Sequence, residues 1–304
     1  MDPLTHALSG LTASYCLPEK TNRHHLFCVV ASCLPDIDNL SFLLGKEMYL
    51  LNHRGFCHSL LGGLILSVFL TVIFRYFDKR VSWQRGLFLS YSLICLHLFL
   101  DLITSFGTQL FSPFTNYRCA IPCVFIIDFF LTSILLSGVI LSFYMPKMRK
   151  AISMACLCMI LIYPIFGKMV QLIQFERAKT VLKQDSQSIH VLPAFFTPLY
   201  WKVIVDKSTH YELRHLSILS AIDNYPSYKY KKANIKTEKK SKDPLLKTYA
   251  WFVDFPAVLD GDTKCQEIID LKFMSANPWF HQFHDRRHMP FKLTICPDSQ
   301  CKLD

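Results

Sequence analysis

Two pairs of polar residues lie at the ends of long apolar stretches. His53 and His58 bracket the start of the segment HRGFCHSLLGG, after which the chain stays apolar to Phe77. Near the end of the next apolar stretch, His97 and Asp101 are four residues apart, which places both on one face of a helix. Imidazole nitrogens and carboxylate oxygens together suit zinc, manganese or iron. The sequence therefore favours a metal site, provided that these two regions meet.

Other histidines and aspartates also lie in or beside apolar segments. An ionised group at bilayer depth costs about 2.5–3.5 kcal/mol even on a lenient scale, so such residues are candidates for function. Taken singly, each has an ordinary explanation, because a histidine at a helix end can simply form hydrogen bonds and an aspartate can end or cap a helix. Taken together, they favour a shared metal site. The complete set is His6, Asp36, Asp38, His53, His58, His97, Asp101 and Asp128.

Apolar residues are concentrated in the first part of the chain. The 304 residues are 51% hydrophobic, and the excess lies in residues 1–175. A transmembrane helix needs about 20 residues, so residues 4–17 and 26–35 are each too short to cross alone and are predicted to form a helical hairpin, half-inserted or packed on the other helices. The predicted transmembrane helices are residues 59–77, 86–104, 124–145 and the shorter 151–167.

The last part of the chain has a different pattern. The runs LYWKVIVD, YAWFVDF, CQEIIDLKF and FKLTIC are short and rich in β-branched and aromatic residues, as is typical of small antiparallel sheets. The lysine-rich residues 228–242 are predicted to be a mobile loop. The expected fold is an α-helical membrane domain over residues 1–175, with about four transmembrane helices and an N-terminal hairpin, followed by a small β-rich soluble domain over 176–304.

The charges of the short loops predict the orientation of the helices. Loops 78–85 and 146–150 are rich in lysine and arginine, whereas loop 105–123 contains only Arg118. The rich loops are expected in the cytoplasm and the C-terminal domain on the opposite side, although the basic residues after the fourth span argue mildly against this. If the N-terminal hairpin dips inward and returns, every candidate residue falls on the non-cytoplasmic face. This agreement is the strongest indication in the sequence that the candidates share a site.

Charge and cysteine content narrow the remaining possibilities. The formal net charge of +10 is explained by positive helix flanks and the lysine run, and attraction to anionic lipid headgroups is a second cause. No basic recognition helix or zinc finger is evident, so nucleic acid is not an expected partner. Most of the 12 cysteines lie in apolar stretches, where cysteine behaves as a small hydrophobe. The close pairs Cys119–Cys123 and Cys296–Cys301 are the ones that an oxidising compartment could join.

The N-terminal segment MDPLTHALSG lacks a positive region, so no cleavable signal peptide is expected. Two other histidine-containing segments are predicted to have no part in the site. His24 and His25 lie in the hairpin turn on the opposite face. The segment HQFHDRRH, residues 281–288, resembles a metal cluster by composition but has no supporting second element and is predicted to be a solvated loop.

Five blocks occur in order along the chain, namely MDPLTHALSG, LPDID, HRGFCHSLLGG, HLFLDLITSFGTQLFSPF and VFIIDFF. With these blocks the chain resembles the YdjM-type family of bacterial inner-membrane proteins, which are regarded as metal-dependent hydrolases. The match is strong over residues 1–145 and looser beyond. A more distant similarity is to helical zinc-dependent phospholipase C enzymes. The metal ligands that the family resemblance implies are His6, Asp36, Asp38, His58, His97 and Asp101.

The match to the family blocks is incomplete at two positions. Cys57 stands where the family usually has threonine, and Phe106 stands where tyrosine is usual. Neither departure removes a ligand. His53 and Asp128 also lie inside family-like blocks.

The first functional hypothesis is an integral inner-membrane hydrolase with a divalent metal, zinc being the first candidate. A bound metal lowers the pKa of its water toward about 7. Asp38 or Asp128 could serve as general base, and the planar fork of Arg54 could bind a phosphate or carboxylate oxyanion. A site at the bilayer surface points to an amphiphilic substrate, such as a phospholipid or another lipid-linked ester.

Two other hypotheses remain open at this point. In one, a structural metal or hydrogen-bond cluster organises the helices of a non-catalytic membrane protein, and the C-terminal domain binds a partner. In the other, the protein is a metal transporter, but the candidates cluster at one face instead of lining a path through the bilayer.

Asp36 and Asp38 are expected to divide their roles. They are two residues apart, which on an α-helix separates them by about 200°. Pro35 favours an extended or helix-end segment. One carboxylate is expected to bind the metal, and the other to orient a histidine or a water.

Overall fold

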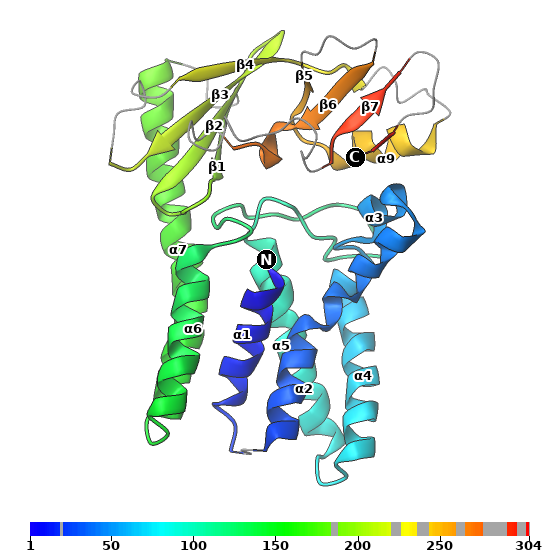
Figure 1. Ribbon diagram of the computed structural model, residues 1–304, viewed down its shortest axis with the longest axis vertical. Helices are drawn as coiled ribbons and strands as arrows, with labels where there is room; N and C mark the ends of the chain where they lie inside the picture. The colour runs from blue at the N-terminus through cyan, green and yellow to red at the C-terminus, as the bar shows by residue number, and fades with distance from the viewer. Residues whose placement is uncertain are drawn as a thin grey trace. The chain divides into compact units, whose positions relative to one another are not determined.

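The computed structural model describes residues 1–18, 21–183, 188–219, 226–235, 243–259, 265–275, 291–296 and 302–303 (Figure 1). The chain forms two compact units. The first comprises Met1–Leu40 and Asn52–Lys168, and the second comprises Ser41–Leu51 and Met169–Asp304.

The first unit is helical, and capping residues fix where most of its helices begin. Asp2, Thr21, Ser59, Ser82 and Asp128 each accept a hydrogen bond from a backbone N–H of the following first turn, which would otherwise have no partner. The helices are α1 (Pro3–Ser14), α2 (Asn22–Cys33), the 3-10 helix η1 (Leu34–Leu44), α3 (Lys46–Asn52), the 3-10 turn η2 (Phe56–His58), α4 (Leu60–Phe77), α5 (Trp83–Leu102), α6 (Phe129–Tyr144) and α7 (Arg149–Leu182). Residues 41–44 of η1, 46–51 of α3 and 169–182 of α7 belong to the second unit.

Four of the described helical segments are long and apolar enough to cross a membrane: Asn22–Leu44, Leu60–Phe77, Trp83–Leu102 and Arg149–Leu182. The expected fold class, a helical membrane part followed by antiparallel sheets, is confirmed. The four segments are not the same four that the sequence predicted, because Asn22–Leu44 is included and α6 is not. Asn22–Leu44 has 23 residues because the helix does not end at Pro35 but continues as η1.

The two later spans also differ from their predicted bounds. α6 has only 16 residues because it begins after its cap Asp128 instead of at residue 124. α7 runs for 34 residues and continues past Pro164, which lies inside it.

Small residues let the helices of the first unit approach closely, as is common between membrane helices. At Gly10 of α1 a Cβ atom would lie 2.5 Å from the carbonyl oxygen of Cys28 in α2. Between α4 and α5, Thr71 Oγ1 lies 3.2 Å from Ser90 Oγ. The outward faces carry large apolar side chains, including Ile65, which is 52% exposed. This surface suits a hydrocarbon environment.

The second unit contains two four-stranded antiparallel sheets. The first sheet is β1 (Ile189–Pro193), β2 (Tyr200–Asp206), β3 (His210–Ser217) and β4 (Ser227–Lys231). The second is β5 (Pro256–Leu259), β6 (Gln266–Asp270), β7 (Leu293–Ile295) and β8 (Lys302–Leu303), with η5 (Leu271–Phe273) after β6 and α9 (Pro244–Phe252) before β5.

Both faces of the first sheet are buried. Trp201, Val203 and Val205 of β2 pack on one side with Ala178 of α7. Ile204 packs on the other side with residues of β5 and β6. On that second side, the buried Lys202 ammonium donates to the carbonyl oxygens of Leu271, Lys272 and Met274, 3.3 Å from the first and 2.9 Å from the last. This lysine therefore joins β2 of the first sheet to the segment that follows β6 of the second.

Two sequence predictions for the second unit are wrong in detail. The run YAWFVDF is not a strand, because Asp243 caps α9 and Pro244 occupies its first position, both of which favour a helix. Tyr249 and Phe252 are buried at helical spacing. In the lysine-rich segment predicted as a loop, residues 228–231 belong to β4, and residues 236–242 lie outside the described residues. The predicted solvated loop at 281–288 lies outside the described residues.

A disulfide joins Cys265 to Cys296. It replaces the expected candidate Cys296–Cys301, whose second member lies outside the described residues, while Cys119 and Cys123 are free thiols. The pairing register explains the disulfide, because Gln266 of β6 lies opposite Ile295 of β7. The residue before the first and the residue after the second are therefore neighbours, although 31 positions separate them in the sequence.

Candidate metal centre

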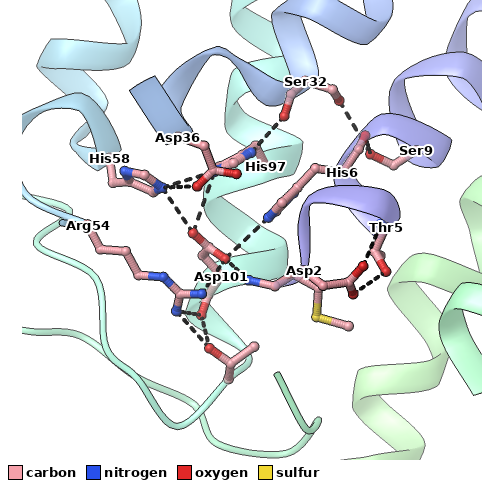
Figure 2. Close-up of polar contacts among 12 residues, drawn as sticks. Asp2, Thr5, His6, Ser9, Ser32, Asp36, Arg54, His58, His97 and Asp101 are labelled. Atoms are coloured by element: carbon pink, nitrogen blue, oxygen red, sulfur yellow. Dashed lines mark hydrogen bonds and ion pairs between the residues drawn. The ribbon is translucent and has the colours of Figure 1, made fainter. Parts of the chain in front are cut away.

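Asp36, His58, His97 and Asp101 form a cluster in the first unit. Each offers one ligand atom, and these atoms all lie within 4.8 Å of one another. Figure 2 shows their side chains turned toward a common point from η1, η2 and α5. His58, His97 and Asp101 are fully buried, whereas the Asp36 side chain is 18% exposed. Two imidazoles and two carboxylates, all of them possible metal ligands, are thus gathered where little water reaches.

α5 presents His97 and Asp101 from consecutive turns. The Nδ1 atom of His97 lies 2.7 Å from the carbonyl oxygen of Ser32 in α2, so Nδ1 donates and Nε2 carries the free lone pair. That Nε2 atom points into the cluster, 3.5 Å from Asp101 Oδ2 and 3.0 Å from His58 Nε2. The carbonyl group of Ser32 in the neighbouring helix α2 therefore fixes the orientation in which His97 can bind a cation.

Asp38 orients His58 from the opposite side of its ring. Its Oδ2 atom lies 2.6 Å from His58 Nδ1, which leaves Nε2 facing Asp101 Oδ2 at 3.1 Å and Asp36 Oδ1 at 3.6 Å. The same carboxylate accepts from the backbone N–H of Arg54 at 3.0 Å and lies 3.1 Å from His53 Nδ1. A carboxylate behind a histidine in this way is the usual support of a metal ligand.

The tight turn before α4 places His58. Arg54 has a left-handed backbone with a φ of 56°, and Gly55 and η2 follow. At Gly62 a Cβ atom would lie 1.9 Å from the carbonyl oxygen of Phe56, so only glycine fits beneath this turn. Gly62 thus lets the histidine-bearing turn fold directly onto the first turn of α4.

Arg54 lies inside the cluster instead of at its surface. It is 2% exposed, its Nη2 atom lies 2.8 Å from Asp101 Oδ1, and its Nη1 atom donates to Thr104 Oγ1 at 2.8 Å. The guanidinium also lies over the Phe106 ring, 4.8 Å from the centroid. Asp101 therefore occupies the fork that was expected to bind a substrate oxyanion.

The other candidate ligands from the sequence, His6, His53 and Asp128, lie at different distances from this four-residue cluster. His6 stacks on His97 with ring centroids 3.6 Å apart, and its Nε2 atom is 3.4 Å from Asp101 Oδ1, which the Met1 amino group also contacts. His53 borders the cluster through Asp38. Asp128 instead caps α6 and accepts hydrogen bonds from the Tyr163 hydroxyl at 2.9 and 3.0 Å.

The donor set fits a divalent cation. Within the described part of the chain, the buried atoms Asp36 Oδ2 and His6 Nε2 have no hydrogen-bond partner. A cation among the carboxylates and imidazoles would satisfy such atoms. Burial lowers the pKa of His58, but hydrogen bonds to Asp101, Asp36 and Asp38 outweigh it and raise the pKa to about 10. A cation at this position would compete with a proton for the His58 imidazole.

Several supporting groups could not be identified as such from the sequence. The carbonyl of Ser32 gives no signal in its residue type, and Phe106 looks like an ordinary apolar residue. Thr104 lies three residues after Asp101 and accepts the Arg54 N–H. Its position three residues after an aspartate at a helix end is the feature of the sequence that indicates a supporting role for Thr104.

A helical membrane unit with a buried cluster of two histidines and two aspartates is the class of protein that these observations define. The pattern of the family described as "YdjM inner membrane protein" matches residues 1–174, more than half of the chain. The protein belongs to this family of inner-membrane proteins.

A curated relative is similar over a shorter stretch. The chain is 30% identical over 103 residues to a Bacillus subtilis (strain 168) protein described as "Uncharacterized protein YfhP". The match spans 34% of this chain and 32% of the relative, so the chain covers about a third of that protein's length. No solved structure matches the chain significantly.

Proposed function

We propose that the protein is a multi-pass inner-membrane hydrolase whose bound divalent metal, zinc in the first instance, activates water for attack on an amphiphilic ester or phosphoester. The observation that carries the proposal is the buried set Asp36, His58, His97 and Asp101, with ligand atoms within 4.8 Å of one another. A metal in such a site lowers the pKa of water toward about 7.

The residues of this chain divide the work as follows. Asp36, His58, His97 and Asp101 hold the metal, with His6 beside Asp101 as a further ligand candidate. Asp38 fixes the His58 ring, and its hydrogen-bonded position behind that ring makes it a positioning group. Arg54 balances the charge of Asp101. Asp128, tied to Tyr163 and the start of α6, supports the fold in this scheme more than it supports the chemistry.

The substrate approaches from the Asp36 side. Of the four clustered side chains, Asp36 alone is appreciably exposed, at 18%. It lies in η1, where the neighbouring side chains of Ile37 and Leu40 are 48% and 59% exposed. A molecule with an apolar tail and an ester or phosphoester head suits such a location.

Metal content and hydrolysis test the proposal together. Purified protein in detergent is expected to contain close to one equivalent of metal by elemental analysis, and to cleave a chromogenic ester or phosphodiester. Removal of the metal by a chelator should abolish cleavage, and zinc, manganese or iron should restore it. Metal at full occupancy without cleavage of any ester or phosphodiester class would favour a structural metal site instead.

The structural alternative has its own support. Arg54 is engaged by Asp101 and Thr104, and three of the four clustered residues are fully buried, as in a cluster that only joins helices. The two functions differ in the hydrolytic activity of the metal-loaded protein. A purely structural metal predicts no hydrolysis before chelation and a lower unfolding temperature after it.

The C-terminal unit is proposed to lie outside the cytoplasm. The Cys265–Cys296 disulfide supports this side, because disulfides form and persist in oxidising compartments. A reporter fused after residue 148 should report cytoplasm, and one fused at residue 304 the opposite side. A cytoplasmic signal from the terminal fusion would contradict this orientation and the shared non-cytoplasmic location of the site.

A further inference from the structure

An apolar cleft separates α2 from α4 far from the metal centre. It has a volume of about 390 Å³. His58 precedes the first residue of α4, whereas the cleft reaches its last residue, and 18 helical residues span about 27 Å. The apolar side chains that line the body of the cleft are Leu26, Phe27, Val30, Leu70, Ile73 and Phe74.

The base of the cleft is formed by buried aromatic rings, and its rim by exposed side chains. The rings of Phe27 and Phe74 stack with centroids 4.1 Å apart, and both side chains are buried. Leu26 and Phe77 stand at the rim, 64% and 65% exposed. Because α2 and α4 both belong to candidate membrane spans, the cleft opens toward the hydrocarbon region of a bilayer. Its walls match an acyl chain in polarity.

One cation stands at the polar end of the cleft. Arg23, in the first turn of α2, lines the cleft and donates one N–H from Nη1 to the carbonyl oxygen of Phe77, the last residue of α4, at 3.2 Å. A guanidinium has five N–H donors in a planar fork that suits phosphate. Arg23 is thus fixed at the mouth of the cleft with donors left for an anion.

The neighbouring residues place this end of the helices at headgroup level. Tyr76 and Trp83 are 79% and 51% exposed, as aromatic residues of the membrane interface usually are. Two other cations at this end of the helices already have partners, because Arg75 donates to the Val81 carbonyl and Arg80 pairs with Asp78. Figure 1 shows that the start of α2 and the end of α4 lie at the same end of the helical unit. The cleft therefore presents a cation at the interface and an apolar wall below it.

We propose that this cleft is a binding site for an anionic phospholipid, with one acyl chain between α2 and α4 and the phosphate on Arg23. A basic pocket between membrane helices is the usual form of such sites. The site is separate from the metal centre and does not depend on the proposed hydrolase activity.

Retained lipid tests the proposal. The full-length protein is reconstituted in vesicles of equal phosphatidylglycerol and phosphatidylcholine, purified in detergent, and its remaining lipids are quantified by mass spectrometry. The wild type is expected to retain phosphatidylglycerol in excess. Arg23→Gln should lower the retained phosphatidylglycerol-to-phosphatidylcholine ratio about fivefold, the effect of one cation near an anionic surface. Val30→Trp, which fills the cleft, should lower the amount of both lipids.

Control variants separate the cleft from general charge and from misfolding. Arg85→Gln removes an exposed cation at the same end of the unit that does not line the cleft, and it should leave the ratio unchanged. Leu26→Trp replaces Val30→Trp if the latter does not fold, because Leu26 lies at the exposed rim. A wild-type ratio equal to that of the vesicles, or an unchanged ratio in Arg23→Gln, overturns the proposal.

Discussion

Replacing His58 with alanine is expected to reduce bound metal to near zero and to abolish any metal-dependent hydrolysis. Its Nε2 atom lies 3.0 Å from His97 Nε2, 3.1 Å from Asp101 Oδ2 and 3.6 Å from Asp36 Oδ1, so it lies close to the other three members of the cluster. The measurement is metal per protein by elemental analysis, at equal protein concentration and after gel filtration.

His53→Gln provides the matched control. His53 is the other histidine of the HRGFCHS segment, but its Nδ1 atom faces Asp38 and its ring centroid is 6.1 Å from that of His58. This variant should keep most of the metal. If His53→Gln loses as much metal as His58→Ala at similar thermal stability, the assignment of ligands within this segment is wrong.

Asp36→Asn and Asp38→Asn are expected to differ in metal affinity. Asp36 contributes a carboxylate oxygen to the cluster, so its loss should lower affinity by more than about 100-fold, whereas loss of a supporting carboxylate such as Asp38 typically costs about 10–100-fold. The asparagine substitutions keep the side-chain volume. The dissociation constant of each variant is measured by titration with a competing chromophoric chelator.

The order of the two affinities decides the assignment. If Asp38→Asn binds metal more weakly than Asp36→Asn, Asp38 is the ligand and Asp36 the supporting group. Equal, full occupancy in both variants would show that neither carboxylate holds the metal.

The sequence predicted the helical membrane part and the β-rich part because apolar runs and alternating strands leave local signals. It also singled out the residues that the structure gathers, since charged groups in apolar segments are rare. The near equivalence of Asp36 and Asp38 could not be resolved from spacing. The segment around Pro35, expected to be extended or a helix end, is a 3-10 helix that follows the end of α2, and only the position of the His58 ring between the two carboxylates distinguishes them.

Other features depend on contacts between distant segments, which no local pattern records. The engagement of Arg54 by Asp101 joins residues 47 positions apart, and the Cys265–Cys296 pairing follows from strand register. The strand assigned to YAWFVDF failed for a different reason. Its aromatic residues suit a strand, but the Asp-Pro sequence at 243–244 starts a helix before them.

The 3-10 helix η1 has a kinetic consequence. Its 11 residues exceed the usual length of such helices, whose hydrogen bonds have poorer geometry than those of an α-helix. Local opening therefore costs less free energy in η1 than in the α-helix α5, which carries His97. Asp36 and Asp38 both lie on this segment. The rate at which a cation is captured or released would then be set by fluctuations of η1, whereas the equilibrium affinity would depend on all four clustered side chains.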